Sequence, residues 1–292
     1  MTERISAVVA LGMFDGVHLG HRALLERAAG EADRLRAKPV VFTFSNHPME
    51  VLGGGVRLLS SIAERDRILA AAGAREVASV PFTRELAALS PERFVDLLLE
   101  RWSVKALVVG YNYTCGARGL GTPDTLAAIG EQRGFSVCVV PPVLYQGSPV
   151  SSTRVREALE RGEVEQAERM LKRRYTLSGM VVENKRIGRR IGFPTANIEA
   201  AGNRVLPKDG VYATFACVDG AYVRAVTNIG TNPTVHGERL MIETHMIGVD
   251  ADLYGKHLTV AFRRYLRGEL TFSSLEALKE QIRLDVAQAA AL

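Results

Sequence analysis

Cysteine is scarce in this 292-residue chain, and its three cysteines form no CxxC pair and no spacing typical of a metal site. Cys115, Cys138 and Cys217 are expected to be reduced, mostly buried thiols, which excludes a disulfide scaffold and favours a cytoplasmic protein. Long apolar runs are also missing. The first run, from Ile5 to Leu11, is too short for a membrane span or a signal peptide. We expect a soluble, cytoplasmic protein with no membrane association and no obligatory protein partner.

The chain also lacks a strong charge of either sign. Its 37 basic and 32 acidic residues give a formal net charge of +5. This modest excess suits polyphosphate ligands, although it equally fits nucleic acid or an ordinary solvated surface. A content of 47% hydrophobic and 24% charged residues is typical of a globular protein, so disorder is not expected. The length favours two domains.

The first half of the sequence alternates apolar runs with amphipathic segments. A helix is expected over residues 21–35, and capping signals at Ser61 and Ser90 indicate two more. Continuous apolar runs between helices are typical of a parallel sheet that is covered on both faces. We therefore predict an α/β, Rossmann-like domain. Its expected strands are residues 7–11, 39–44, 105–110 and 136–140.

The second half has a different pattern, in which strands follow one another without helices. The dipeptide Asp219-Gly220 between two apolar runs is a strong hairpin signal. Such a series predicts an antiparallel β-barrel. A final helix with the apolar stripe Leu275, Leu278, Ile282, Val286 and Ala289 is expected to pack on that barrel. We place the domains at residues 1–172 and 173–292, with strands at 177–182, 211–218, 222–229, 240–247 and 258–265.

Two histidines flank a glycine in the loop after the first expected strand, in the order His18-Leu19-Gly20-His21. Residues three apart share one face of a helix, so both imidazoles can face one ligand. Gly20 leaves room for a phosphate, and the free amides of the helix start attract an anion. The carboxyl end of a strand is also where open α/β sheets bind ligands. The segment predicts a polyphosphate site in preference to two structural histidines.

The residues from Gly12 to His21 read Gly-Met-Phe-Asp-Gly-Val-His-Leu-Gly-His, which resembles the signature of bacterial FAD synthetase domains, a branch of the His-x-Gly-His nucleotidyltransferases. Residues 43–48, 109–116 and 151–156 are similar to further motifs of that family. The resemblance implies that His18 and His21 bind the ATP phosphates and stabilise charge that develops at the α-phosphorus. It also implies a flavin contact for His47, and ATP contacts for Gly12, Phe14, Asp15, Gly20, Asn112, Ser152, Thr153 and Arg156.

A second segment, residues 188–198, combines glycines and basic residues with a hydroxyl and an amide. Glycines at 188 and 192 permit close approach of the backbone to phosphates. Thr195 and Asn197, two apart on an extended segment, point to the same face and can hold Mg²⁺ together with phosphate oxygens. From composition alone, a basic turn that leads into a strand is the simpler interpretation.

The run Gly-Phe-Pro-Thr-Ala-Asn at residues 192–197 resembles the hallmark of riboflavin kinases, and residues 227–234, 242–245 and 252–255 are similar to that family too. The resemblance implies that Glu243 is the base that takes the proton of the riboflavin 5′-hydroxyl. It implies that Arg267 lies in a loop that closes over the flavin. ATP phosphates are then held at Gly188, Gly192, Thr195 and Asn197, with Mg²⁺ at Thr195 and Asn197.

Together the two signatures predict a bifunctional enzyme that uses ATP and Mg²⁺ to convert riboflavin to FMN, and then FMN to FAD with release of pyrophosphate. A different acceptor, such as a pantetheine phosphate or nicotinamide mononucleotide, fits the histidine motif alone, but the flavin-type barrel argues against it. The basic stretches 172–174 and 185–190 could instead form a nucleic-acid patch. They lack interleaved aromatic residues, so no nucleic-acid partner is expected.

Overall fold

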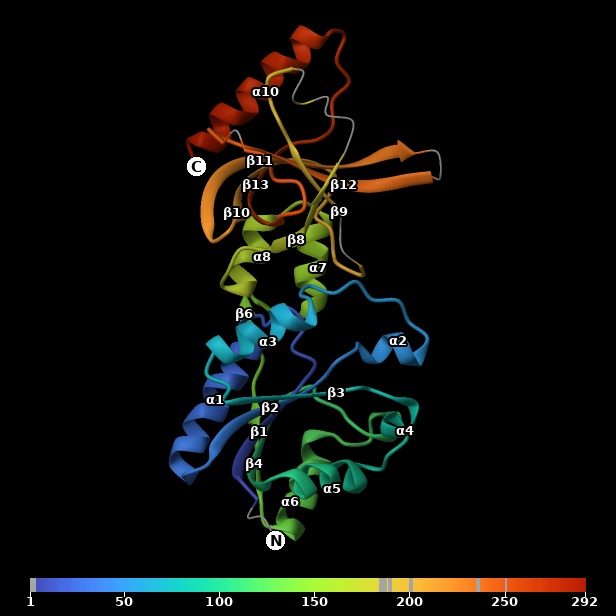
Figure 1. Cartoon of the computed structure of the whole chain (residues 1–292). Helices are drawn as coiled ribbons and strands as arrows, with labels where there is room; N and C mark the ends of the chain where they lie inside the picture. The colour runs from blue at the N-terminus through green and yellow to red at the C-terminus, as the bar shows by residue number, and fades with distance from the viewer. Residues whose placement is uncertain (1–3, 184–187, 189–190, 200–201, 235–236, 250) are drawn as a thin grey trace. The chain divides into compact units, whose positions relative to one another are not determined.

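The computed structural model describes residues 4–183, 188, 191–199, 202–234, 237–249 and 251–292 (Figure 1). The chain divides into two compact units, Met1–Ser152 and Thr153–Leu292. Most of the basic stretch 185–190, including Arg189 and Arg190, lies outside the described residues. The predicted domain boundary lies after residue 172, and the division between the units lies after Ser152. The two helices α7 (Ser152–Glu160) and α8 (Val164–Leu171) lie between these two positions.

The first unit is built on a five-stranded sheet of order β3-β2-β1-β4-β5, in which every neighbouring pair is parallel. The chain runs from the central strand β1 outward through β2 and β3, and then returns to β4 and β5 on the other side. The direction of winding therefore reverses between β1 and β4, the place where open α/β sheets bind ligands. The strands are β1 (Ser6–Leu11), β2 (Lys38–Phe44), β3 (Glu76–Val80), β4 (Ser103–Gly110) and β5 (Ser136–Val140).

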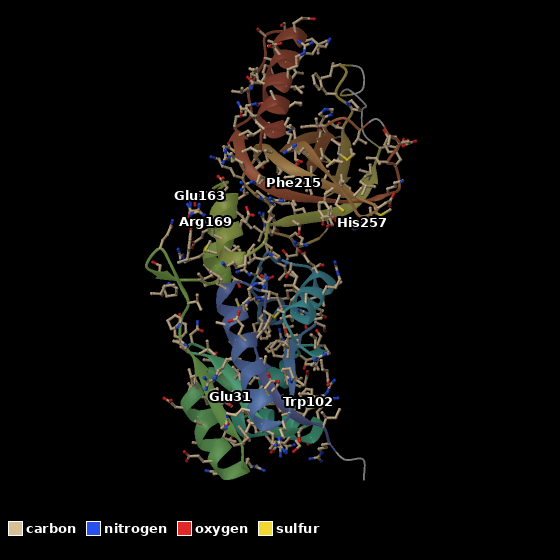
Figure 2. The ribbon with its side chains drawn as sticks, turned by 90° about the vertical axis from the view of Figure 1, so that its left-hand side faces the viewer. Glu31, Trp102, Glu163, Arg169, Phe215 and His257 are labelled. Carbon is tan, nitrogen blue, oxygen red and sulfur yellow. The ribbon has the colours of Figure 1, made fainter. Side chains whose placement is uncertain are left out.

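Both faces of this sheet are buried, as the apolar runs predict. Ala7, Val9 and Leu11 of β1 belong to a core cluster with residues of α5 and α6, whereas Val8 and Ala10 belong to one with residues of α1. Figure 2 labels Trp102, from the first cluster, and Glu31 of α1. The helices are α1 (Leu19–Leu35), α2 (Pro48–Leu52), α3 (Ile62–Ala71), α4 (Arg84–Ala87), α5 (Pro91–Arg101) and α6 (Pro123–Arg133).

Two predicted helix caps are confirmed, whereas the helix expected from residue 21 begins at Leu19. Ser61 accepts a hydrogen bond from the Glu64 amide (3.2 Å), and Ser90 accepts one from the Arg93 amide (3.3 Å). Each serine thus satisfies one free donor of its helix. The short strand β3, at the edge of the sheet, was not predicted.

The second unit contains a closed barrel of order β10-β11-β12-β9-β8-β13, which confirms the predicted architecture. Asp219 and Gly220 join β10 to β11 with positive φ angles of 51° and 83°, the backbone of a two-residue hairpin. The strand β9 was not predicted. The strands are β8 (Thr176–Val182), β9 (Ala196–Glu199), β10 (Gly210–Val218), β11 (Ala221–Thr234), β12 (Gly237–Met246) and β13 (His257–Arg267).

The last helix, α10 (Leu275–Ala290), packs against β10 and β11, but only part of its apolar stripe does so. Val286 and Ala289 join a core cluster with Val211 and Val226. Leu275 is 48% exposed. Leu278 and Ile282 line a cavity of the barrel unit. The prediction that the whole stripe packs on the barrel is therefore wrong for Leu275, while Leu278 and Ile282 are half-buried beside that cavity.

Candidate active sites

The loop after β1 is held in an unusual backbone conformation. Phe14, Gly16 and Val17 all have positive φ, at 56°, 77° and 43°. Such angles are unfavourable for bulky residues, and above all for β-branched ones, so surrounding contacts have to fix the loop. Phe14 is fully buried, and its ring centroid lies 5.1 Å from that of His21. Strain of this kind is typical of functional loops.

Asp15 provides the strongest of these contacts. Its carboxylate, 3% exposed, accepts hydrogen bonds from the amides of Leu59 (2.9 and 3.1 Å) and Ser60 (3.2 Å). Ser60 Oγ in turn accepts from the Gly16 amide at 3.2 Å. The carboxylate that was predicted to contact ATP thus points into the protein and ties the loop to residues 59–60.

The two motif histidines lie together at the start of α1. His18 is the N-cap residue, and its Nδ1 accepts from the His21 amide at 3.4 Å. The two rings are stacked, with centroids 3.7 Å apart and planes at 17°. The geometry confirms that both side chains face the same space. A Cβ added at Gly20 would lie only 3.1 Å from the His18 ring, so glycine there also leaves room for that ring.

His21 has the electrostatics of a ligand site. Burial, and then the neighbouring His18, hold the pKa of His21 well below its ordinary value, so the ring is neutral at physiological pH. Its Nδ1 atom is buried and has no hydrogen-bond partner within the described structure. A buried, unpaired polar atom is costly, and a bound acceptor or donor would satisfy it.

These side chains open into a cleft of about 720 Å³ at the carboxyl ends of β1, β4 and β5. Its lining includes six of the predicted site residues: Gly12, His18, Gly20, His21, Asn112 and Ser152. Ser152 Oγ donates to the Asp15 carbonyl at 3.0 Å, which ties this serine to the histidine loop.

Five predicted residues do not line the cleft. Phe14 and Asp15 are buried, and His47 caps α2, where its Nδ1 accepts from the Met49 amide at 3.2 Å. Thr153 and Arg156 belong to the second unit and are not part of the lining.

The other end of the cleft is apolar and aromatic, a feature that was not predicted from the sequence. Phe44, Phe82, Leu86 and Phe94 contribute to it from the end of β2, the loop after β3, α4 and α5. The rings of Phe44 and Phe82 meet edge to face, 5.1 Å apart. One cleft therefore joins a polar end that suits phosphates to an apolar end that suits a flat ring system.

A buried cation supports the same cleft. Arg65 of α3 is 1% exposed, and its guanidinium donates to the Phe44 carbonyl (2.7 Å), to Ser79 Oγ (3.0 Å) and to Asp66 (2.9 Å). It also lies 3.5 Å from the Met13 carbonyl. Arg65 thus connects the ends of β1, β2 and β3, and nothing in the local sequence distinguishes it from a surface arginine.

The barrel unit has its own cavity of about 610 Å³. Gly188, Thr195, Asn197, Glu243 and Arg267, five of the residues predicted for a kinase site, line it. Gly192 is exposed and does not line it; its φ of 88° serves the turn. Two hydrogen bonds close this turn, from the amides of Phe193 (2.8 Å) and Ile191 (3.2 Å) to the Gly188 carbonyl.

Glu243 is the middle one of three polar residues that lie side by side on neighbouring strands. In the sheet register it lies opposite Asn228 of β11 on one side and opposite Asn197 of β9 on the other. All three residues line the cavity, and Asn197 is 7% exposed. Cross-strand neighbours lie close together, so a carboxylate is flanked by two amides on a sheltered surface. Asn228 was not among the predicted site residues.

Arg267 forms an ion pair with a carboxylate. Its guanidinium forms a bidentate ion pair with Asp285 of α10, with N–O distances of 2.7 to 3.1 Å. Gln281 Nε2 donates to the same carboxylate at 3.0 Å. The predicted flavin contact therefore borders the cavity while its charge is balanced by a buried aspartate.

The donors at this site suit Mg²⁺. No cluster of three His, Cys, Asp or Glu side chains that could hold a metal ion occurs in the described part of the chain. Thr195, Asn197 and Glu243 instead offer hydroxyl, amide and carboxylate oxygens on one cavity wall. Mg²⁺ prefers such oxygen ligands and takes its remaining ones from water and phosphates.

Both units match families of known proteins. The FAD synthetase family model matches residues 1–154, and the riboflavin kinase model matches residues 171–292. The bifunctional riboflavin kinase/FMN adenylyltransferase of Escherichia coli strain K12 is 38% identical over 282 residues, or 95% of this chain and 90% of that protein. The protein of the same name from Bacillus subtilis strain 168 is 33% identical over 294 residues, or 98% of this chain and 92% of that protein.

A solved structure from Streptococcus pneumoniae, described as a macrolide-efflux protein, has a TM-score of 0.92 to this chain. It is 30% identical and covers 98% of this chain and 95% of its own. The macrolide-efflux function is stated for that protein and not for this chain. Among the residues described for this chain, no helix is both long enough and apolar enough to traverse a bilayer.

Proposed function

The chain belongs to the family of bifunctional riboflavin kinase/FMN adenylyltransferases, and from that premise we propose how its two cavities divide the chemistry. The protein phosphorylates riboflavin to FMN and adenylylates FMN to FAD. The observation that supports the division is that each unit has its own cavity, lined by residues of one signature only.

Adenylyl transfer is assigned to the cleft of the first unit. The triphosphate of ATP lies at the polar end, against His18, His21 and Ser152, and the isoalloxazine ring of FMN lies at the apolar end, near Phe44 and Phe82. A phosphate oxygen of FMN attacks the α-phosphorus, and pyrophosphate leaves. The nearby anion raises the pKa of His21 from its depressed value, so the imidazole gains both a partner and positive charge as phosphate binds. Thr153 and Arg156 remain proposed contributors to the triphosphate.

Phosphoryl transfer is assigned to the barrel cavity. Glu243 accepts the proton of the riboflavin 5′-hydroxyl as that oxygen attacks the γ-phosphorus, and ADP leaves. Thr195 and Asn197 hold Mg²⁺ and phosphate oxygens, while Gly188 lets the backbone approach them. When bound there, Mg²⁺ would stabilise the negative charge of the phosphates. The flanking amides of Asn197 and Asn228 keep the carboxylate oriented.

We further propose that the enzyme works in the cytoplasm with Mg²⁺ and without a nucleic-acid, membrane or obligatory protein partner. Its three cysteines are free thiols, which supports a reducing compartment.

The residue assignment is tested by chromatography of reaction mixtures that contain riboflavin or FMN with ATP and Mg²⁺. Glu243→Gln should abolish FMN formation and leave FMN-to-FAD conversion intact. Glu199→Gln is the matched control, because Glu199 lies opposite Met241 in the same sheet and does not line the cavity. The assignment fails if Glu243→Gln still forms FMN at the wild-type rate, or if the Glu199 variant loses it equally.

A further inference from the structure

His245 lies on the same strand as Glu243 and faces the same cavity. The two residues are two apart on β12, so their side chains point to one face of the sheet, and both line the cavity. His245 has no assigned role in the reaction above. A role for His245 at this cavity rests on the proposed kinase function and extends that function by one residue.

The ring of His245 is bonded to the loop that precedes β9. Its Nδ1 lies 2.8 Å from the Pro194 carbonyl oxygen. A carbonyl can only accept, so Nδ1 carries the proton in this bond. The neighbouring Phe193 ring meets the imidazole edge to face, with centroids 5.5 Å apart. Two consecutive loop residues therefore contact one side chain.

This bond sits where the backbone ladder stops. The pairing of β12 with β9 runs from Met241–Glu199 to Thr244–Ala196 and ends there. Proline has no N–H, so Pro194 cannot donate to a continued ladder. The His245 side chain supplies a bond at this point instead, and so extends the connection between the two strands by one more link.

The loop needs such a link because it carries Gly188 and Thr195, which are proposed to hold the phosphates and, at Thr195, the metal. Its other end is closed by the Phe193 amide on the Gly188 carbonyl. In the described part of the chain, the hydrogen bond from His245 is the one that connects Pro194 to β12. Thr195 follows directly, and Asn197 lies opposite Glu243.

We propose that His245 is a positioning residue for phosphoryl transfer: by holding the Pro194 carbonyl, it fixes the adjacent Thr195 near the base Glu243. The proposed role requires a hydrogen-bond donor at the position of Nδ1 and does not involve Nε2. Loss of that donor loosens the phosphate loop. The KM for ATP in the kinase reaction then rises and the kcat falls, while the adenylyltransferase site of the same chain is unaffected.

The alternative is that His245 acts chemically through Nε2, as an acid, a base or a phosphate ligand. Two substitutions separate these roles. In His245→Asn the side-chain amide nitrogen stands at the same number of bonds from Cα as Nδ1, so the bond to Pro194 can form. In His245→Gln the amide stands near the place of Nε2, and the donor at Nδ1 is lost.

The experiment measures kcat and KM for ATP in FMN formation by full-length His245→Asn, His245→Gln and His245→Ala, with FMN-to-FAD conversion as the control for the other site and the thermal melting curve as the control for folding of the barrel unit. We expect His245→Asn to stay within about threefold of wild type. His245→Gln and His245→Ala should lose about tenfold or more in kcat/KM, the effect of one lost hydrogen bond on an ordered loop. Nitrogen NMR of the ring should also find a proton on Nδ1.

The inference is overturned if His245→Asn is as impaired as His245→Ala, because the ring itself is then required, or if all three variants keep wild-type kinetics. It is also overturned if Nδ1 carries no proton. A wild-type protein that forms no FMN would refute the kinase site itself, a result that differs from all of these.

Discussion

Removal of the Asp15 carboxylate should destabilise the first unit and disable adenylyl transfer. The carboxylate accepts from two amides, those of Leu59 and Ser60, at 2.9 to 3.2 Å. Leu59 is 0% and Ser60 3% exposed, so water cannot replace the lost acceptor. A hydrogen bond to a charged group contributes about 1.5–3 kcal/mol, and two such bonds near the lower end of that range give about 3–4 kcal/mol for Asp15→Ala.

Differential scanning calorimetry gives the test. A loss of this size lowers the melting temperature of a domain of this length by roughly 10 °C. FMN-to-FAD conversion should fall with it, because the positive-φ backbone at Phe14 and Val17 loses its clamp, while FMN formation in the barrel unit persists. Asp15→Asn keeps one acceptor oxygen and should recover about half of the loss in stability.

Asp33→Ala is the matched control, since Asp33 is an exposed carboxylate of α1 in the same unit. The reasoning is refuted if Asp15→Ala melts within about 2 °C of wild type, or if the Asp33 variant is destabilised as much.

Three further outcomes are expected. Arg65→Met should lower the free energy of unfolding by about 3 kcal/mol in denaturant titrations, because the Phe44 carbonyl and Ser79 lose a buried hydrogen-bond donor. It should also reduce FAD formation but not FMN formation. A variant with wild-type stability would contradict this prediction. The pKa of His21 is depressed in the folded state, so its stabilising contribution is present above about pH 6.5 and is lost as the pH falls below that value. The urea midpoint should therefore drop less on acidification in His21→Gln than in wild type, and equal slopes would argue against a buried neutral ring. Chelation of Mg²⁺ with EDTA should stop FMN formation, and added Mg²⁺ should restore it; an undiminished rate in EDTA would refute a metal at Thr195 and Asn197.

The features that could be predicted from the sequence are those whose signals are local. The hairpin at Asp219 and Gly220, the helix cap at Ser61 and the buried strand β1 all depend on neighbouring residues in the chain. The two histidines were predicted to share a ligand because their spacing alone brings them together on α1.

The features that were missed depend on partners far away in the sequence. Arg65 differs from a surface arginine only through its bonds to Phe44 and Ser79, and Arg267 finds Asp285 only when α10 folds onto the barrel. His245 and Pro194 are 51 positions apart. The short strand β9 has a sequence that also fits a loop, and its pairing with β12 decides its structure.

The central claim is that two independent sites act in sequence, one in each unit, and complementation of two inactive variants tests it most directly. Glu243→Gln should form FAD from FMN but not from riboflavin, and His21→Gln should form FMN from riboflavin but little FAD. When the two variants are mixed with riboflavin, ATP and Mg²⁺, FAD should accumulate after FMN appears in solution. A mixture that forms no FAD, although each variant keeps its expected single activity, would contradict the claim that the barrel site delivers a free product to the histidine site.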